Sequence, residues 1–241
     1  MAKTSKTKDR PSLADRITAP VHWLRRWTLR LIFLAVVIVL GTVTAHRVFN
    51  PPDTLYMKQE TARLGKIDHQ WVPMDAIAPV MARSVVAAED ANFCLHWGFD
   101  MGAIRAAIED GGARGASTLS QQVVKNVYLW HGRSWLRKAL EAAITPAVEA
   151  IWSKRRILEV YLNVAEFDEG IFGVEAAARH YFGVGPEALT DHQAARLAAI
   201  LPAPKERSAS RPGDFVRRRA AQIMDGAATI RRDGRAACFE D

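Results

Sequence analysis

Apolar residues recur at intervals of about three to four through most of the chain, the spacing of helices with one buried face. Thr118 with Gln121, and Thr190 with Gln193, have the spacing of capping boxes, which mark helix starts. No stretch alternates apolar and polar residues long enough for a large sheet, and no segment repeats. The sequence therefore predicts a mainly α fold, with helices over residues 77–90, 101–110, 118–130, 134–152, 154–166, 173–182, 190–201 and 214–230.

Residues 31–46 contain no Lys, Arg, Asp or Glu and predict one membrane-spanning helix. A helix of this length rises roughly 24 Å, a little less than a hydrocarbon core of about 30 Å. Trp27 and Arg30 can cover the difference, because such side chains reach the interface. A buried core helix is one alternative, and small residues at 43–45 leave a cleavable signal peptide as another. The long basic stretch before the span favours an uncleaved anchor.

The net charge of +7 is concentrated at the N-terminus. Residues 1–30 hold eight of the 33 basic residues and two of the 26 acidic ones, which leaves 25 basic against 24 acidic residues elsewhere. This distribution fits a cytoplasmic basic tail better than a surface for nucleic acid. We expect a cytoplasmic tail at 1–30, a transmembrane helix at 31–46, a juxtamembrane linker at 47–70 and one domain outside the cytoplasm at 71–241.

Cys94 and Cys238 have neither a CxxC spacing nor a histidine pattern suited to zinc. We expect both to be packing residues. A disulfide is the alternative in an oxidising compartment, but the sequence does not place the two residues within bonding distance.

The segment 89–100 groups acids, a histidine and aromatic residues at the end of an apolar helix. A carboxylate beside aromatic surface can have a raised pKa, which suits a general base or acid. Glu89 is therefore a candidate base. The alternative is that Glu89, Asp90 and His96 only cap and connect helix ends, and the residues themselves do not decide between the two.

Residues 111–118 form a glycine-rich approach to a helix, a weak signal for an anion site because no Gly-Lys-Ser/Thr sequence ends it. On that helix, Gln121 and Gln122 can share a face with Lys125. Farther on, Arg133, Arg137 and Lys138 precede Glu141. This group is either a set of surface ion pairs or a cationic pocket suited to a pyrophosphate leaving group.

In order along the chain, these segments resemble the family fifty-one glycosyltransferases, and most closely its monofunctional peptidoglycan members. The resemblance covers about residues 71–184 and the anchor, and it departs only at Val184, where the family usually has a lysine. Its five motifs are Glu89-Asp90-x-x-Phe93-x-x-His96-x-Gly98-x-Asp100, Gly115-x-Ser117-Thr118-x-x-Gln121-Gln122-x-x-Lys125-Asn126, Arg137-Lys138-x-x-Glu141, Ile157-Leu158-Glu159-x-Tyr161-Leu162-Asn163 and Gly170-Ile171-x-Gly173-Val174-x-x-Ala177-Ala178-x-x-Tyr181-Phe182-Gly183.

The resemblance implies a lysozyme-like helical domain with a small membrane-facing lobe. It implies that the enzyme polymerises lipid II into β-1,4-linked glycan by inverting displacement of undecaprenyl pyrophosphate. Glu89 would deprotonate the acceptor 4-hydroxyl, and Glu141 would be the second carboxylate. Lys125, Arg133 and Arg137 would hold the pyrophosphate, and the donor or substrate would further contact Ser117, Gln121, Gln122, Asn126, Asp90 and His96.

The resemblance implies no organic cofactor. A divalent metal, Mg²⁺ or Mn²⁺, held through Glu141 is a further candidate. Expected partners are lipid II, the nascent glycan strand, the bacterial inner membrane and other cell-wall synthesis proteins.

Two rival functions differ in chemistry. A glycan-cleaving enzyme of the same fold needs an acid at the leaving oxygen and has little use for clustered cations. An inactive membrane-tethered scaffold does not explain why every motif acid and cation named above is present. A penicillin-binding activity is excluded, because the Ser-x-x-Lys match from Ser5 to Lys8 lies in the basic tail without a Lys-Thr-Gly.

Overall fold

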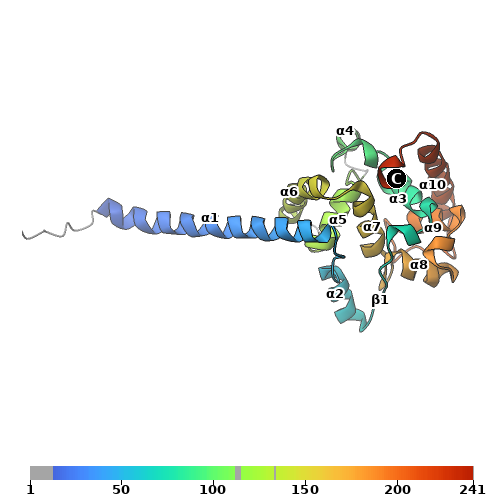
Figure 1. Ribbon diagram of the computed structural model, residues 1–241, viewed down its shortest axis with the longest axis horizontal. Helices are drawn as coiled ribbons and strands as arrows, with labels where there is room; N and C mark the ends of the chain where they lie inside the picture. The colour runs from blue at the N-terminus through green and yellow to red at the C-terminus, as the bar shows by residue number, and fades with distance from the viewer. Residues whose placement is uncertain (1–12, 112–114, 133, 241) are drawn as a thin grey trace, which may run out of the picture. The chain divides into compact units, whose positions relative to one another are not determined.

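The computed structural model describes residues 13–111, 115–132 and 134–240, and side chains from residue 21. The chain forms two compact units, one up to Thr42 and one from Val43 onward. The first unit consists of helix α1 (Leu13–His46), which also extends into the second unit. Its Val21–His46 segment is long and apolar enough to cross a membrane, with a mean hydropathy of 2.2. The helix begins at Leu13, well before the predicted span (Figure 1).

The second unit is mainly helical, as predicted. Each of the eight predicted helical segments contains one helix, and the bounds differ by a few residues at the ends. These helices are α3 (Pro79–Glu89), α4 (Met101–Glu109), α5 (Leu119–Tyr128), α6 (Trp135–Ile151), α7 (Lys154–Val164), α8 (Gly173–Phe182), α9 (Asp191–Ile200) and α10 (Asp214–Arg232). Short 3₁₀ helices occur at Met74–Ala76, Phe93–Leu95 and Pro186–Ala188.

The segment expected to be a linker contains helix α2 (Leu55–Leu64) and strand β1 (Asp68–His69). Thr54 caps the start of α2, and Gly65 ends it in the left-handed conformation at φ 81°. The pattern did not predict this helix, because its apolar positions are few and only Met57 and Glu60 are buried. Since α2 packs against α5, the segment belongs to the folded unit and contributes to its site.

A small sheet joins β1 to two later strands, β2 (Glu166–Asp168) and β3 (Ile171–Phe172), in the order β1-β3-β2. β3 runs parallel to β1 and antiparallel to β2. Gly173 starts α8 at φ +79°, and a Cβ there would lie 2.9 Å from the carbonyl oxygen of Asn163. The buried Asn163 amide in turn bonds both backbone polar groups of Val72, at 2.8 and 2.9 Å. These motif residues therefore hold the sheet against α7.

Helices α3, α9 and α10 pack against one another, while α5 packs against α6 and α7. α7 supplies the predicted core stripe, since Ile157, Leu158 and Leu162 are fully buried and Tyr161 is nearly so. The last helix, α11 (Ala237–Glu240), packs on α7 and on the 3₁₀ helix after α3 (Figure 1). The C-terminal end of α3 and the start of α5 also lie close together, although many residues separate them in the sequence.

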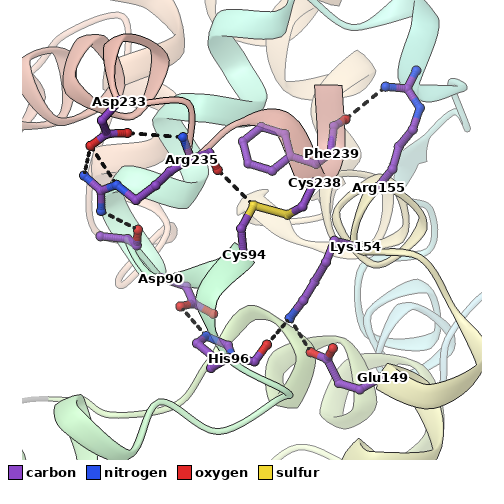
Figure 2. Close-up of a disulfide and its surroundings, with 11 residues drawn as sticks. Asp90, Cys94, His96, Glu149, Lys154, Arg155, Asp233, Arg235, Cys238 and Phe239 are labelled. Atoms are coloured by element: carbon purple, nitrogen blue, oxygen red, sulfur yellow. Dashed lines mark hydrogen bonds and ion pairs between the residues drawn. A yellow bond between two sulfur atoms is a disulfide. The ribbon is translucent and has the colours of Figure 1, made fainter. Parts of the chain in front are cut away.

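Cys94 and Cys238 form a disulfide with Cα atoms 5.7 Å apart (Figure 2). Our expectation that they are separate packing residues is wrong. The two residues lie 144 positions apart in the sequence, so only the tertiary fold of α11 brings them together.

Candidate active site

Glu89 is the last residue of α3 and points its carboxylate at α5. The side-chain amide of Gln122 donates a hydrogen bond to Glu89 Oε2 at 2.9 Å. Burial raises the pKa of Glu89, while this hydrogen bond and the charges of Arg219 and Lys125 act in the opposite direction. A partly desolvated carboxylate with a single side-chain donor is suited to accept a proton near neutral pH.

Asp90, the residue after Glu89, has different hydrogen-bond partners. Asp90 is 7% exposed and accepts a hydrogen bond from Nε2 of His96 at 2.8 Å and from the backbone N–H of Leu119 at 3.0 Å. Nδ1 of His96 accepts from the N–H of Gly98 at 3.2 Å, which is consistent with a neutral imidazole protonated at Nε2. Both side chains are thus occupied in joining the end of α3 to the start of α5. These contacts favour the capping alternative for Asp90 and His96.

The two glutamines of helix α5 have different hydrogen-bond partners. Gln121 is 5% exposed and accepts from the N–H of Thr118 at 3.0 Å, which completes the predicted capping box. Gln122 turns instead to Glu89 and also lines a cavity with Lys125 and Asn126. The structure therefore brings Gln122, Lys125 and Asn126 to one site and places Gln121 in the helix cap.

This cavity has a volume of about 380 Å³. Lys125 lines it, its ammonium group makes no ion pair or hydrogen bond to any described residue, and burial lowers its pKa. Glu141 and Glu89 oppose that shift. A cation that lines a cavity and forms no ion pair there is available to an anionic ligand.

Glu141 is 3% exposed and collects the cations at the start of α6. It accepts from Arg137 at 3.2 Å and pairs with Lys138. The ammonium of Lys138 also donates to the hydroxyl of Ser117 at 3.1 Å, so Ser117 joins this cluster. Arg133, predicted to belong here, lies outside the described residues.

The contacts of Glu141 also show whether its carboxylate is free to bind a metal ion. Both carboxylate oxygens of Glu141 already accept from cations. Within the described ranges, no group of three or more His, Cys, Asp or Glu side chains could hold a metal ion. The residues described do not fit a metal held by the protein alone.

The other end of the cavity is built from residues that the sequence analysis missed. The phenol of Tyr56 donates to Glu166 at 2.7 Å, and burial raises the pKa of Tyr56 to about 12. His131 stacks on this ring at 3.8 Å, and its pKa falls to about 4, mainly through burial. Lys205 pairs with Glu166 at 3.3 Å. Tyr56 lies in the expected linker, and Lys205 lies beyond the last of the five motifs, so no motif indicated either residue.

The comparisons with known proteins identify the family of the chain. The sequence model of the family described as "Transglycosylase" matches residues 57–228. The chain is 60% identical to the biosynthetic peptidoglycan transglycosylase of Jannaschia sp. (strain CCS1) over 99% of both chains. It is 46% identical to the protein of the same description from Caulobacter vibrioides, over 86% of this chain and 94% of the relative. A third such relative, from Pseudomonas fluorescens (strain SBW25), is 51% identical over 80% and 84%.

Proposed function

The chain belongs to the transglycosylase family and is a peptidoglycan glycosyltransferase that polymerises glycan strands in cell wall synthesis, and we propose that its substrate is lipid II. One observation carries the assignment of the reacting groups. Gln122 donates a hydrogen bond to Glu89 and lines the same cavity as Lys125. Helix α5 therefore carries, three residues apart, the amide that contacts the proposed base and a cation at the cavity. A base beside a cationic cavity suits attack by a sugar hydroxyl on a donor with an anionic leaving group.

In the proposed reaction, Glu89 takes the proton from the 4-hydroxyl of the acceptor sugar. That oxygen bonds to the anomeric carbon of the donor strand, while the bond from this carbon to the undecaprenyl diphosphate oxygen breaks on the opposite face. An α-linked donor thereby becomes a β-1,4 linkage, and the proton remains on Glu89 until solvent removes it. The desolvation of Glu89 favours its protonated form and so favours this transfer.

The leaving diphosphate gains one negative charge beyond those it already carries, and it needs cations more than a proton. Lys125 and the pair Arg137 and Lys138 would supply these charges. Glu141, buried between the two cations of α6, would keep them in place and reduce their mutual repulsion. Asn126 would position the donor from the cavity wall. Arg133, which lies outside the described residues, would help to hold the diphosphate.

We propose that the protein sits in the bacterial inner membrane with its N-terminus in the cytoplasm and its catalytic unit in the periplasm. The apolar helix and the basic tail support this orientation. The Cys94–Cys238 disulfide supports it independently, since such bonds persist in oxidising compartments. Large apolar side chains exposed on the catalytic unit would form the membrane-facing lobe, and they are Leu95, Trp97, Met101, Ile108, Trp135 and Leu136.

The test is a polymerisation assay in which the full-length protein in detergent receives lipid II and, separately, intact cell wall. The proposal predicts glycan polymer and free undecaprenyl diphosphate from lipid II, with no fragments from the wall. Wall fragments without polymer would assign the site to glycan cleavage instead.

A further inference from the structure

The last residues of the chain hold the segment that follows Glu89. The guanidinium of Arg235 donates to the carbonyl oxygen of Ala91 at 3.0 Å. Three residues later, Cys238 is bonded to Cys94 (Figure 2). Both contacts are made by residues beyond the part of the chain that the family model matches. The C-terminal segment therefore holds residues 91–94 through two contacts, and the residues that make them, Arg235 and Cys238, lie outside the shared motifs.

Contacts with Phe239 and Lys154 also hold this segment in place. The rings of Phe93 and Phe239 are fully buried, with centroids 6.4 Å apart. The ammonium of Lys154 lies 4.4 Å from the centre of the Phe93 ring and donates to the carbonyl oxygen of His96 at 2.8 Å. Glu149 pairs with Lys154 at 2.8 Å, which keeps the ammonium in place. The segment is thus held between α11 and α7.

These contacts reach Glu89 through a closed turn. The backbone N–H of Phe93 donates to the carbonyl oxygen of Asp90 at 3.0 Å, and the side chain of His96 returns to the Asp90 carboxylate. Asp90 directly follows Glu89 and also holds the start of α5. A shift of the turn is therefore passed to Asp90 and from there to the reacting carboxylate.

We propose that the Cys94–Cys238 disulfide, together with Arg235, is a positioning device that holds Glu89 in its productive place against Gln122. The proposal rests on the proposed role of Glu89 as the base. α11 has only four residues, too few for a helix that is stable by itself, so its grip depends on its tertiary and covalent contacts. The disulfide is the covalent one among these contacts and closes a loop of 144 residues, so it restricts the segment most.

The device makes the enzyme sensitive to reduction. Both sulfurs belong to partly exposed residues, so a small dithiol can reach them. Its thiolate attacks one sulfur and releases the other cysteine as a thiolate. The second thiol of the reductant then attacks the mixed disulfide, which releases the first cysteine and leaves the reductant as a cyclic disulfide. Two electrons thus pass to the protein, which ends with two free thiols. Full activity is therefore gained only in a compartment where the bond can form.

The experiment compares the full-length protein in three states, namely oxidised, reduced with dithiothreitol, and reoxidised with oxidised glutathione. All assays run well below the unfolding midpoint of the least stable state. We expect reduction to lower kcat by about ten-fold with KM changed less than about two-fold, since a displacement of about 1 Å can cost roughly a hundred-fold. Reoxidation restores kcat. Cys94→Ser with Cys238→Ser gives the reduced behaviour without any reductant.

The pH profile separates positioning from stability. Burial raises the pKa of Glu89, so a loosened turn that admits water moves the acidic limb of kcat/KM to lower pH. Arg219 from α10, Lys125 from α5, Asp90 from the turn and Tyr161 from α7 are the charged or titratable groups that influence or face this carboxylate, and none of them belongs to α11. A disulfide that only stabilises the fold leaves this limb where it is.

A pair of arginine variants gives the matched control. Arg235→Gln is expected to lower kcat in the same direction as reduction, because it releases Ala91. Arg232→Gln is expected to keep the wild-type kcat, because the hydrogen bond of this guanidinium within the described part of the chain is to Thr229 on its own helix.

An unchanged kcat on reduction overturns the proposal, and so does a lower kcat with an unmoved acidic limb. If Glu89→Gln remains active, the proposed base itself is wrong. If that variant is inactive while reduction has no effect, only the positioning role fails.

Discussion

The amide of Gln122 stands 2.9 Å from the carboxylate of Glu89, and this contact joins the end of α3 to the cavity-facing side of α5. It connects the proposed base with the wall that carries Lys125. The proposed mechanism depends on that connection, because the proton acceptor and the cation for the leaving group must act on one bound pair of substrates.

The first prediction concerns the pH dependence of wild-type enzyme. Because burial raises the pKa of Glu89, the acidic limb of kcat/KM is expected above about 4.3, the value of an exposed glutamate. Activity falls as pH decreases through this pKa, since the protonated base cannot accept the acceptor's proton. A rate profile of lipid II polymerisation measures it. A limb at the ordinary glutamate value would show that Glu89 is solvated during the reaction.

The second prediction changes the partner of that carboxylate. Gln122→Met removes the hydrogen bond that stabilises ionised Glu89 and keeps a side chain of similar volume. The pKa of Glu89 therefore rises, and the acidic limb moves to higher pH. Gln122→Glu is the informative comparison, because a second negative charge raises this pKa as well. A limb that moves to lower pH in the methionine variant would contradict the arrangement.

The third prediction concerns the cation in the cavity. Lys125→Met removes a charge that pairs with no described residue and is therefore free for the leaving group. We expect kcat to fall by roughly 10²–10³, the usual cost of losing one group that stabilises developing charge. Lys125→Arg should recover part of the rate. Lys58→Met, on an exposed position of α2, is the control and should leave kcat unchanged.

The fourth prediction separates Asp90 from its neighbour. Asp90→Ala removes the acceptor for the part-buried His96 and for the buried N–H of Leu119. The free energy of unfolding should fall by about 2–3 kcal/mol, as for hydrogen bonds to a charged group. Denaturant unfolding measures it, with the exposed Asp225→Ala as a control expected within about 0.5 kcal/mol. Full stability in the Asp90 variant would exclude the capping role.

Much of the helical fold was predictable, because α3 and α5 to α10 have regular apolar spacing and clear caps such as Thr118. Helix α2 was not, since its ten residues bury only Met57 and Glu60 and give almost no periodicity. Tyr56 was missed for the same reason. The motifs identified Glu89 and Lys125, but a motif cannot tell a residue that faces substrate from one that holds the motif together.

Asp90 and Gln121 show that limit within the candidate site. Each stands in a motif beside a residue that faces the cavity or the base, and each is occupied by backbone N–H groups instead. The disulfide shows a second limit. Its cysteines are 144 residues apart, and only the folded path of the C-terminus brings Cys238 to Cys94. Contacts of this kind depend on tertiary packing, which local spacing does not encode.

The most direct measurement of the central claim is the initial rate of lipid II polymerisation by Glu89→Gln at neutral pH. The substitution keeps the size of the side chain but removes its capacity to accept a proton. The account predicts a loss of roughly 10²–10⁴, the contribution of a general base, with unchanged circular dichroism and with full activity in Glu109→Gln, at the exposed end of α4. A Glu89→Gln enzyme that polymerises at the wild-type rate would place the base elsewhere.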